Sequence, residues 1–242
     1  MSREHGNLVL LFYIGVSVFG IILITTWAIN PTISGDGVLW RKPFIGSLFS
    51  LICVLGIFAT QFPNSCAGAF HFQKTTQGSA YLQNPTVSHH PACQEFSAHV
   101  VRVKGRVRCA ACSGLLLGAV VSLVGAIFYF FYGEQIESAS FLPVWVGALF
   151  VLEGFSQSKF KGWARLTLNS LFVLGGFLCL VGIDQILQNL ATDLFLVILI
   201  VFWILTKIQL SQWDHSRICD NCKSVCGDEQ TNENGVSVCD PS

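Results

Sequence analysis

Long uninterrupted blocks of apolar residues are the feature of this sequence that most constrains its fold. A helix needs about 20 residues to cross the hydrocarbon core of a bilayer. Six blocks reach or approach that length, at 8–29, 43–63, 113–132, 141–158, 163–183 and 190–210. They lack the alternation of barrel strands, and only helices and closed barrels satisfy their backbone hydrogen bonds in lipid. The sequence therefore predicts an all-α membrane protein with about six transmembrane helices.

The polar segments divide the chain into four parts. We expect transmembrane helices one and two in 1–63, a cytoplasmic Cys/His metal-binding loop in 64–112, helices three to six in 113–210 and a cytoplasmic Cys-rich tail in 211–242. The formal net charge is zero, and the basic residues form short clusters between the apolar blocks. Membrane lipid is therefore an expected partner, and nucleic acid is not.

Lys and Arg are distributed unevenly between the two sides of the predicted membrane. One side contains Arg3, Lys74, Arg102, Lys104, Arg106, Arg108, Lys159, Lys161, Arg165, Lys207, Arg217 and Lys223. The other side contains only Arg41 and Lys42, with Glu134, Glu137 and Asp184 in its remaining connections. By the positive-inside rule, we expect a multi-pass cell-membrane protein whose N- and C-termini are both cytoplasmic.

This topology determines what the ten cysteines can do. Cys53 and Cys179 lie within predicted helices, where cysteine behaves as a small apolar residue. The other eight lie on the reducing side, where structural disulfides are disfavoured. We interpret them first as metal ligands and second as redox groups.

The long loop contains the clearer metal motif. In the Cys109-x2-Cys112 pair, two thiolates from one turn can chelate a single ion, and Cys93 and His99 complete a tetrahedral zinc site. His89 or His90 could replace His99 as the ligand. Between the half-sites, residues 100–108 alternate apolar and basic around Gly105, a pattern that predicts a β-hairpin like that of a zinc ribbon. The helix that starts here also favours the thiolate of Cys112, which would make it a candidate nucleophile.

The tail contains a second cysteine group. Its members are Cys219, Cys222, Cys226 and Cys239. Four cysteines suffice for an all-thiolate zinc site. An iron–sulfur cluster is less expected, because the spacing matches no ferredoxin-type run. Alternatively, the loop and the tail could share ligands in one cytoplasmic lobe that also uses Cys66 and His71.

Two features of the helices have both a structural and a functional interpretation. Glu153 could carry a proton or bind an ion in a transporter, but we favour an interfacial pair with Lys159 or Arg165. Small residues recur every four positions in the third helix, at Gly114, Gly118, Ser122 and Ala126. They predict close helix packing within the chain, with an oligomeric or heteromeric contact as the alternative.

The segment 89–118, and above all the run Cys109-Ala110-Ala111-Cys112-Ser113-Gly114, resembles an uncharacterised family of prokaryotic membrane proteins. In that family an upstream Cys precedes a Cys-Ala-x-Cys-Thr-Gly run that enters a transmembrane helix. This chain departs from the pattern at Ala111, where a basic residue is common, at Ser113 in place of Thr, and at Gln94, where His commonly follows the upstream Cys. The resemblance implies a prokaryotic membrane location, and it implies no activity.

The motifs favour a non-enzymatic function. Closed four-ligand metal sites are typically structural, and the sequence has no phosphate loop, nucleophile elbow, His-Glu-x-x-His motif or dinucleotide fingerprint. We expect a subunit or assembly factor of a membrane complex, with other membrane subunits or a second copy as partners. A membrane oxidoreductase or thiol enzyme is the first alternative, and a transporter that uses Glu153 is the second.

Overall fold

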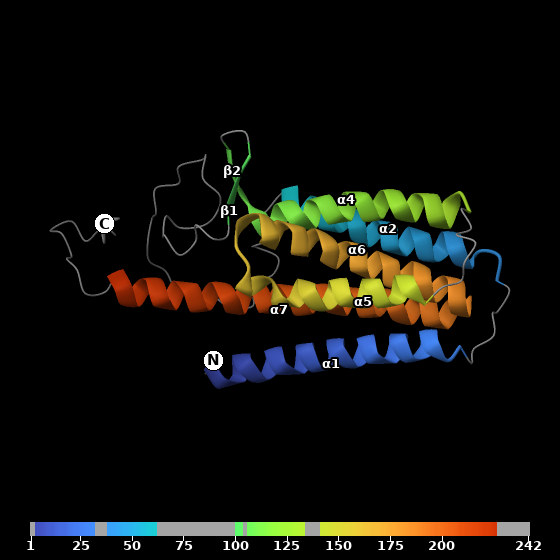
Figure 1. Ribbon diagram of the computed structural model, residues 1–242, viewed down its shortest axis with the longest axis horizontal. Helices are drawn as coiled ribbons and strands as arrows, with labels where there is room; N and C mark the ends of the chain where they lie inside the picture. The colour runs from blue at the N-terminus through green and yellow to red at the C-terminus, as the bar shows by residue number, and fades with distance from the viewer. Residues whose placement is uncertain (1–2, 32–37, 62–99, 104–105, 134–140, 227–242) are drawn as a thin grey trace.

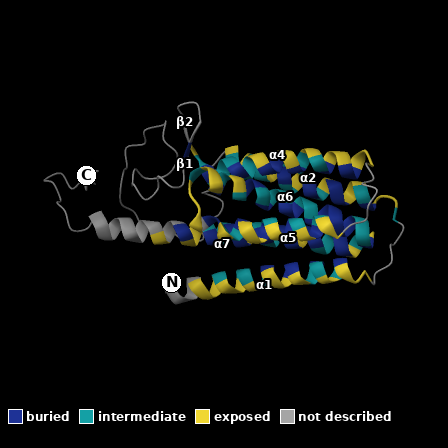
Figure 2. Ribbon diagram, in the orientation of Figure 1, coloured by how far each residue is buried: buried dark blue, intermediate teal, exposed yellow. Residues whose placement is uncertain are grey.

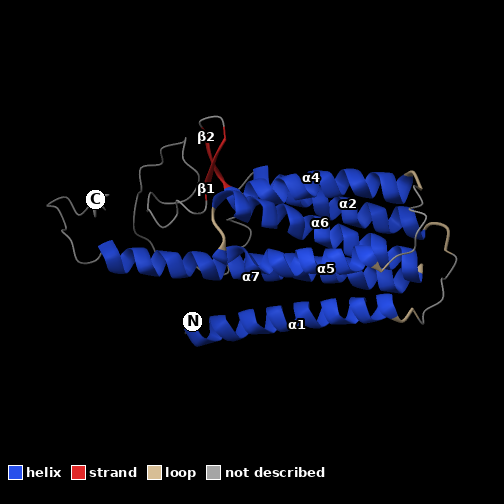
Figure 3. Cartoon of the chain, viewed as in Figure 1, coloured by secondary structure: helices blue, strands red, loops and turns tan. Residues whose placement is uncertain are grey.

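The computed structural model describes residues 3–31, 38–61, 100–103, 106–133 and 141–226 (Figure 1). These described residues are almost entirely helical, with one small hairpin among them (Figure 3). The elements are α1 (Arg3–Ile29), α2 (Arg41–Gln61), β1 (Val100–Val103), β2 (Arg106–Cys109), α4 (Ala110–Phe131), α5 (Leu142–Phe155), the 3-10 helix η2 (Ser156–Lys159), α6 (Gly162–Leu187) and α7 (Leu190–Cys226).

Five helices among the described residues are long and apolar enough to cross a membrane. They are α1, α2, α4, α6 and α7, each overlapping one of the predicted apolar blocks. α5 is apolar but shorter, at 14 residues. The prediction of an all-α, multi-pass membrane protein is therefore confirmed.

The helices lie side by side and alternate in direction (Figure 1). One end of the bundle, which we call the hairpin end, contains β1, β2 and the starts of α1, α4 and α6. The opposite end, which we call the far end, contains the starts of α2, α5 and α7. α7 continues past the bundle at the hairpin end.

α6 is the central helix, and buried residues gather along it (Figure 2). It packs closely against α5 because two glycines face each other: a Cβ on Gly147 would lie 2.6 Å from the carbonyl oxygen of Gly175, and a Cβ on Gly175 would lie 2.6 Å from that of Gly147. Contacts this short leave no room for any side chain. The two backbones can therefore approach closely only because both positions are glycine.

The small-residue stripe of α4 also faces α6. A Cβ on Gly118 would lie 2.7 Å from the carbonyl oxygen of Ser170, and the Ser170 hydroxyl donates to the Gly114 carbonyl oxygen at 2.8 Å. Ser122 and Ala126 are fully buried. The stripe therefore packs within the chain, as the favoured interpretation predicted.

α1 lies at the edge of the bundle and docks on α7. The Ser17 and Thr206 hydroxyls are 2.8 Å apart, and the Trp203 indole donates to the Ser17 carbonyl oxygen at 3.4 Å. Much of the remaining surface of α1 exposes large apolar side chains, including Leu11 and Phe19. That surface suits contact with lipid tails.

Candidate functional site

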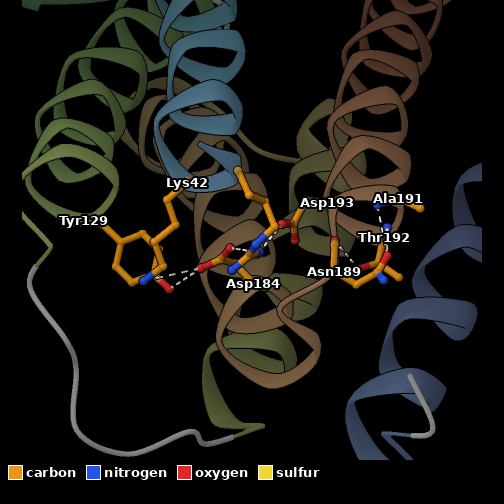
Figure 4. A network of polar contacts seen from close by, with 8 residues as sticks. Lys42, Tyr129, Asp184, Asn189, Ala191, Thr192 and Asp193 are labelled. Atoms are coloured by element: carbon orange, nitrogen blue, oxygen red, sulfur yellow. Dashed lines mark hydrogen bonds and ion pairs between the residues drawn. The ribbon is translucent and has the colours of Figure 1, made fainter. Parts of the chain in front are cut away.

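Charged side chains and a tyrosine hydroxyl from several helices converge at the far end of the bundle. Arg41 begins α2, Tyr129 lies near the end of α4, Asp184 near the end of α6 and Asp193 in the first turn of α7. All four are buried, and both aspartates are fully inaccessible. We call these residues, together with Lys42, the far-end cluster (Figure 4).

Arg41 connects the two aspartates. One guanidinium nitrogen, Nη1, donates to Oδ1 of Asp184 and to Oδ2 of Asp193. Such a pairing compensates charges that would otherwise be costly to bury in a low-dielectric interior. Arg41 therefore ties the start of α2 to both α6 and α7.

Asp184 has further partners on its second oxygen. The Tyr129 hydroxyl donates to Oδ2 at 2.7 Å, and the Lys42 amine lies 3.9 Å from the same oxygen (Figure 4). The amine also lies 4.9 Å from the centroid of the Tyr129 ring. Because the Lys42 side chain is 35% exposed, it connects the cluster with the surface.

A tight turn brings the two aspartates together. Gln188 ends α6 in the left-handed region, with φ at 49°. The side-chain oxygen of Asn189 then accepts from the backbone N–H of Ala191 at 3.0 Å and of Thr192 at 3.4 Å, which caps the start of α7. Asp193 lies one turn later, where the positive end of the helix dipole favours an acidic residue.

A second group of buried polar residues lies toward the hairpin end. Arg165 of α6 pairs with Asp214 of α7 at 3.2 Å, and both side chains are nearly inaccessible. The Lys207 amine donates to the Gly154 carbonyl oxygen at 2.8 Å and lies 4.3 Å from the centroid of the Phe172 ring. Gly154 is in the last turn of α5, so Lys207 caps the negative end of that short helix.

The predicted hairpin is confirmed. β1 and β2 pair antiparallel, with Val100 opposite Cys109 and Val103 opposite Arg106. Val101 and Ala110 are buried, and β1 contacts α6, so the hairpin packs on the bundle.

Cys109 and Cys112 lie where β2 passes into α4. Cys109 is the extended residue that precedes the helix, and Cys112 lies in its first turn. Both are partly exposed, whereas Cys53 and Cys179 are buried in the apolar core, as predicted. The structure thus places two thiols one turn apart at the edge of the bundle, a spacing suited to chelation of one ion.

The other predicted ligands of the loop site, His89, His90, Cys93 and His99, lie outside the described residues, as does Cys239 of the tail. Within the described part of the chain, no group of three or more Cys, His, Asp or Glu side chains could hold a metal ion. Metal binding therefore stays a prediction for both sites.

The backbone of the tail constrains the second predicted site. α7 is helical through Cys219, Cys222 and Cys226. At about 1.5 Å per residue, a continuous helix separates the first and third of these by about 10 Å along its axis. That is farther than two cysteines bound to one ion with Zn–S bonds of about 2.3 Å can span. An all-thiolate site on one ion therefore requires this part of α7 to unwind.

Glu153 lies outside both buried polar groups. Its side chain is exposed near the end of α5, and Lys159 is exposed as well. The predicted pairing of Glu153 with Lys159 or Arg165 stays a prediction; Arg165 is buried and forms an ion pair with Asp214.

The far-end cluster is what the sequence interpretation missed. That interpretation placed Arg41, Lys42 and Asp184 in connections between helices, whereas α2 begins at Arg41 and α6 continues to Leu187. A usable signal was present: charged or hydroxyl-bearing residues occur at four predicted span ends, all on the same side of the membrane. Residues at one end of adjacent antiparallel helices can converge.

Comparison with protein-family models, curated proteins and solved structures gives no match. The functional conclusions below therefore rest on the residues of this chain.

Proposed function

We propose that this chain is a non-enzymatic integral membrane protein that holds structural zinc on its cytoplasmic side and serves as a subunit or assembly factor of a membrane complex. The observation that carries the proposal is the position of Cys109 and Cys112 at the junction of a β-hairpin and a transmembrane helix. In zinc ribbons, too, a Cys-x2-Cys pair lies beside a hairpin. A metal bound here would fix how α4 enters the bundle.

Cys93 and His99 are the proposed additional ligands, with His89 or His90 as replacements for His99. Val100 directly follows His99 in the sequence and pairs with Cys109 across the hairpin. The chain therefore enters the hairpin beside one of the two thiols. For the tail, we propose that Cys219, Cys222, Cys226 and Cys239 bind a second zinc ion once the end of α7 unwinds. This cost in helix structure makes the tail the weaker of the two sites.

The proposed topology has six crossings, with α5 and η2 together forming the fourth. Their 14 and 4 residues rise by about 29 Å in total at helical spacings, close to the hydrocarbon thickness of about 30 Å. Six crossings return the chain to the side where it began. Because Lys159, Lys161, Arg108 and Arg217 lie toward the hairpin end, we assign that end to the cytoplasm of a cell membrane.

A partner-binding role is supported by the end of α7, which projects from the bundle at the hairpin end. Residues 215–226 of α7 extend about 18 Å beyond its apolar span, on the same side as β1 and β2. Together these elements would present a docking surface to other membrane subunits or to a second copy. The resemblance of residues 89–118 to an uncharacterised prokaryotic membrane family is compatible with this role and suggests no reaction.

Elemental analysis of the detergent-purified protein, combined with its optical spectrum, tests the proposal. We expect a colourless protein with about one or two zinc ions per chain, and Cys109→Ser with Cys112→Ser should remove one of them. Cys53→Ala with Cys179→Ala is the matched control, since both thiols are buried in the core, and it should retain all of the zinc. Unchanged zinc in the Cys109/Cys112 variant would contradict the proposal. Iron with visible absorption would favour the oxidoreductase alternative.

A further inference from the structure

The two aspartates of the far-end cluster differ in how many hydrogen-bond donors they receive. Both oxygens of Asp184 have donors, since Arg41 donates to Oδ1 and Tyr129 to Oδ2. Asp193 receives Arg41 on Oδ2, but its Oδ1 is buried with no hydrogen-bond partner among the described residues. A buried carboxylate oxygen without a donor is costly. Counted in hydrogen-bond donors, the carboxylate of Asp193 is therefore less well satisfied than that of Asp184, whereas the dipole at the start of α7 acts in the opposite direction.

The charge balance of the cluster also indicates that one of the two carboxyl groups holds a proton. Asp184 and Asp193 are fully inaccessible, and Arg41 is buried between them, so the inaccessible part of the cluster contains two carboxyl groups and one guanidinium. With both aspartates ionised this part would have a net negative charge. With one proton it is neutral, as a low-dielectric interior requires. Lys42 compensates the negative charge less than Arg41 does, because the Lys42 side chain is 35% exposed and its amine lies 3.9 Å from the nearer oxygen of Asp184.

We propose that Asp193 is a proton-binding site, with the proton on the oxygen that receives no hydrogen bond. Arg41 and Asp184 then form the buried ion pair, and Tyr129 and Lys42 hold the second oxygen of Asp184. The far-end turns of α1 (21–29) and α5 (142–145) contain no charged or titratable residue, and Tyr132, which ends α4, is 75% exposed.

Loss of the proton from Asp193 would also affect how the helices pack at the far end. When Asp193 loses it, two buried carboxylates share one guanidinium nitrogen and repel each other across the α6–α7 turn. Because Lys42 links Asp184 to the exposed surface, relief of that repulsion would involve movement of α2 or α7 toward water. Proton release from Asp193 therefore loosens the far end of the bundle.

Infrared difference spectroscopy on the whole detergent-purified protein tests for the proton. Wild type should show the carbonyl stretch of a protonated carboxyl group at neutral pH, shifting in heavy water, and Asp193→Asn should lose it. Asp214→Asn is the control: its carboxylate pairs with Arg165 near the other end, and the band should persist. Absence of the band from wild type, or its persistence in Asp193→Asn, would overturn the proposal.

Stability provides a second, independent readout. An asparagine imitates a protonated aspartate in shape and charge, so Asp193→Asn should leave the midpoint of thermal unfolding within a few degrees of wild type. Asp184→Asn removes the carboxylate that Arg41, Tyr129 and Lys42 share, and it should lower the midpoint clearly. Equal losses in the two variants would mean that both carboxylates are ionised, which overturns the proposal.

Discussion

The guanidinium group of Arg41 lies against the carboxylate of Asp184, although 143 residues separate the two in the sequence. The contact joins the first residue of α2 to the last turn of α6, and Asp193 extends it to α7. A single cation thus holds three helices together at the far end. Its removal should affect the whole bundle.

Arg41→Ala should lower the free energy of unfolding by about 3–5 kcal/mol, the usual cost of leaving a buried charge without its partner. Unfolding in mixed micelles with increasing denaturing detergent measures the change. Lys42→Ala is the matched control one residue away, and for this 35% exposed side chain we expect a loss of about 1 kcal/mol or less. Similar losses in both variants would show that burial of Arg41 between the aspartates does not determine stability.

Gly175→Ala should destabilise the contact between α5 and α6. The added methyl group would lie 2.6 Å from the Gly147 carbonyl oxygen, and overpacking of this kind costs about 1–3 kcal/mol. Gly56→Ala in α2 is the control, because an added Cβ there meets nothing within 4 Å. The same unfolding assay should show no loss for Gly56→Ala, and a wild-type result for Gly175→Ala would refute the close approach.

The docking of α1 should depend on the hydroxyl pair in its middle. Ser17→Ala and Thr206→Val each remove one side of a 2.8 Å contact. A double-mutant cycle should give a coupling of about 0.6 kcal/mol, and at most about 2, as is usual for interhelical hydrogen bonds in membranes. Thr26→Ala is a suitable comparison, since that hydroxyl bonds to the backbone of its own helix at Ile22. Replacing Thr206 in a Thr26→Ala background should show no coupling.

Thiol labelling in intact cells checks which end of the bundle faces the cytoplasm. Leu39→Cys places a thiol at a position that is 97% exposed at the far end, and a membrane-impermeant maleimide should label it from outside. Cys109 and Cys112 at the hairpin end should react only after permeabilisation and removal of the proposed zinc with a chelator. Labelling of the native cysteines in intact cells would reverse the assigned topology.

The positions of the helices could be predicted because crossing a bilayer demands a length of apolar residues that few soluble segments possess. The hairpin could be predicted because residues 100–108 alternate apolar and basic around Gly105. Both signals are local in the sequence. Neither depends on which helices are neighbours.

The far-end cluster could not be predicted in the same way. A hydropathy argument ends a helix at its first charge, which put Asp184 outside the membrane. In the fold, Arg41 compensates that charge, so α6 continues for another turn. Lys207 was counted among the cytoplasmic basic residues for a similar reason, yet it is buried because the last turn of α5 offers it a carbonyl oxygen. For both Asp184 and Lys207, burial depends on a partner that is distant in the sequence.

α7 has a mechanical property that follows from its length. Between Asp193 and Cys219 it contains neither glycine nor proline, the residues at which helices usually kink. These 26 steps form a rod of about 39 Å. A twist or tilt imposed on its first turn, where Asp193 meets Arg41, would therefore reach the segment with Cys219 on the opposite side of the membrane. A conformational change at one face of the bilayer could therefore be transmitted along α7 to the other face.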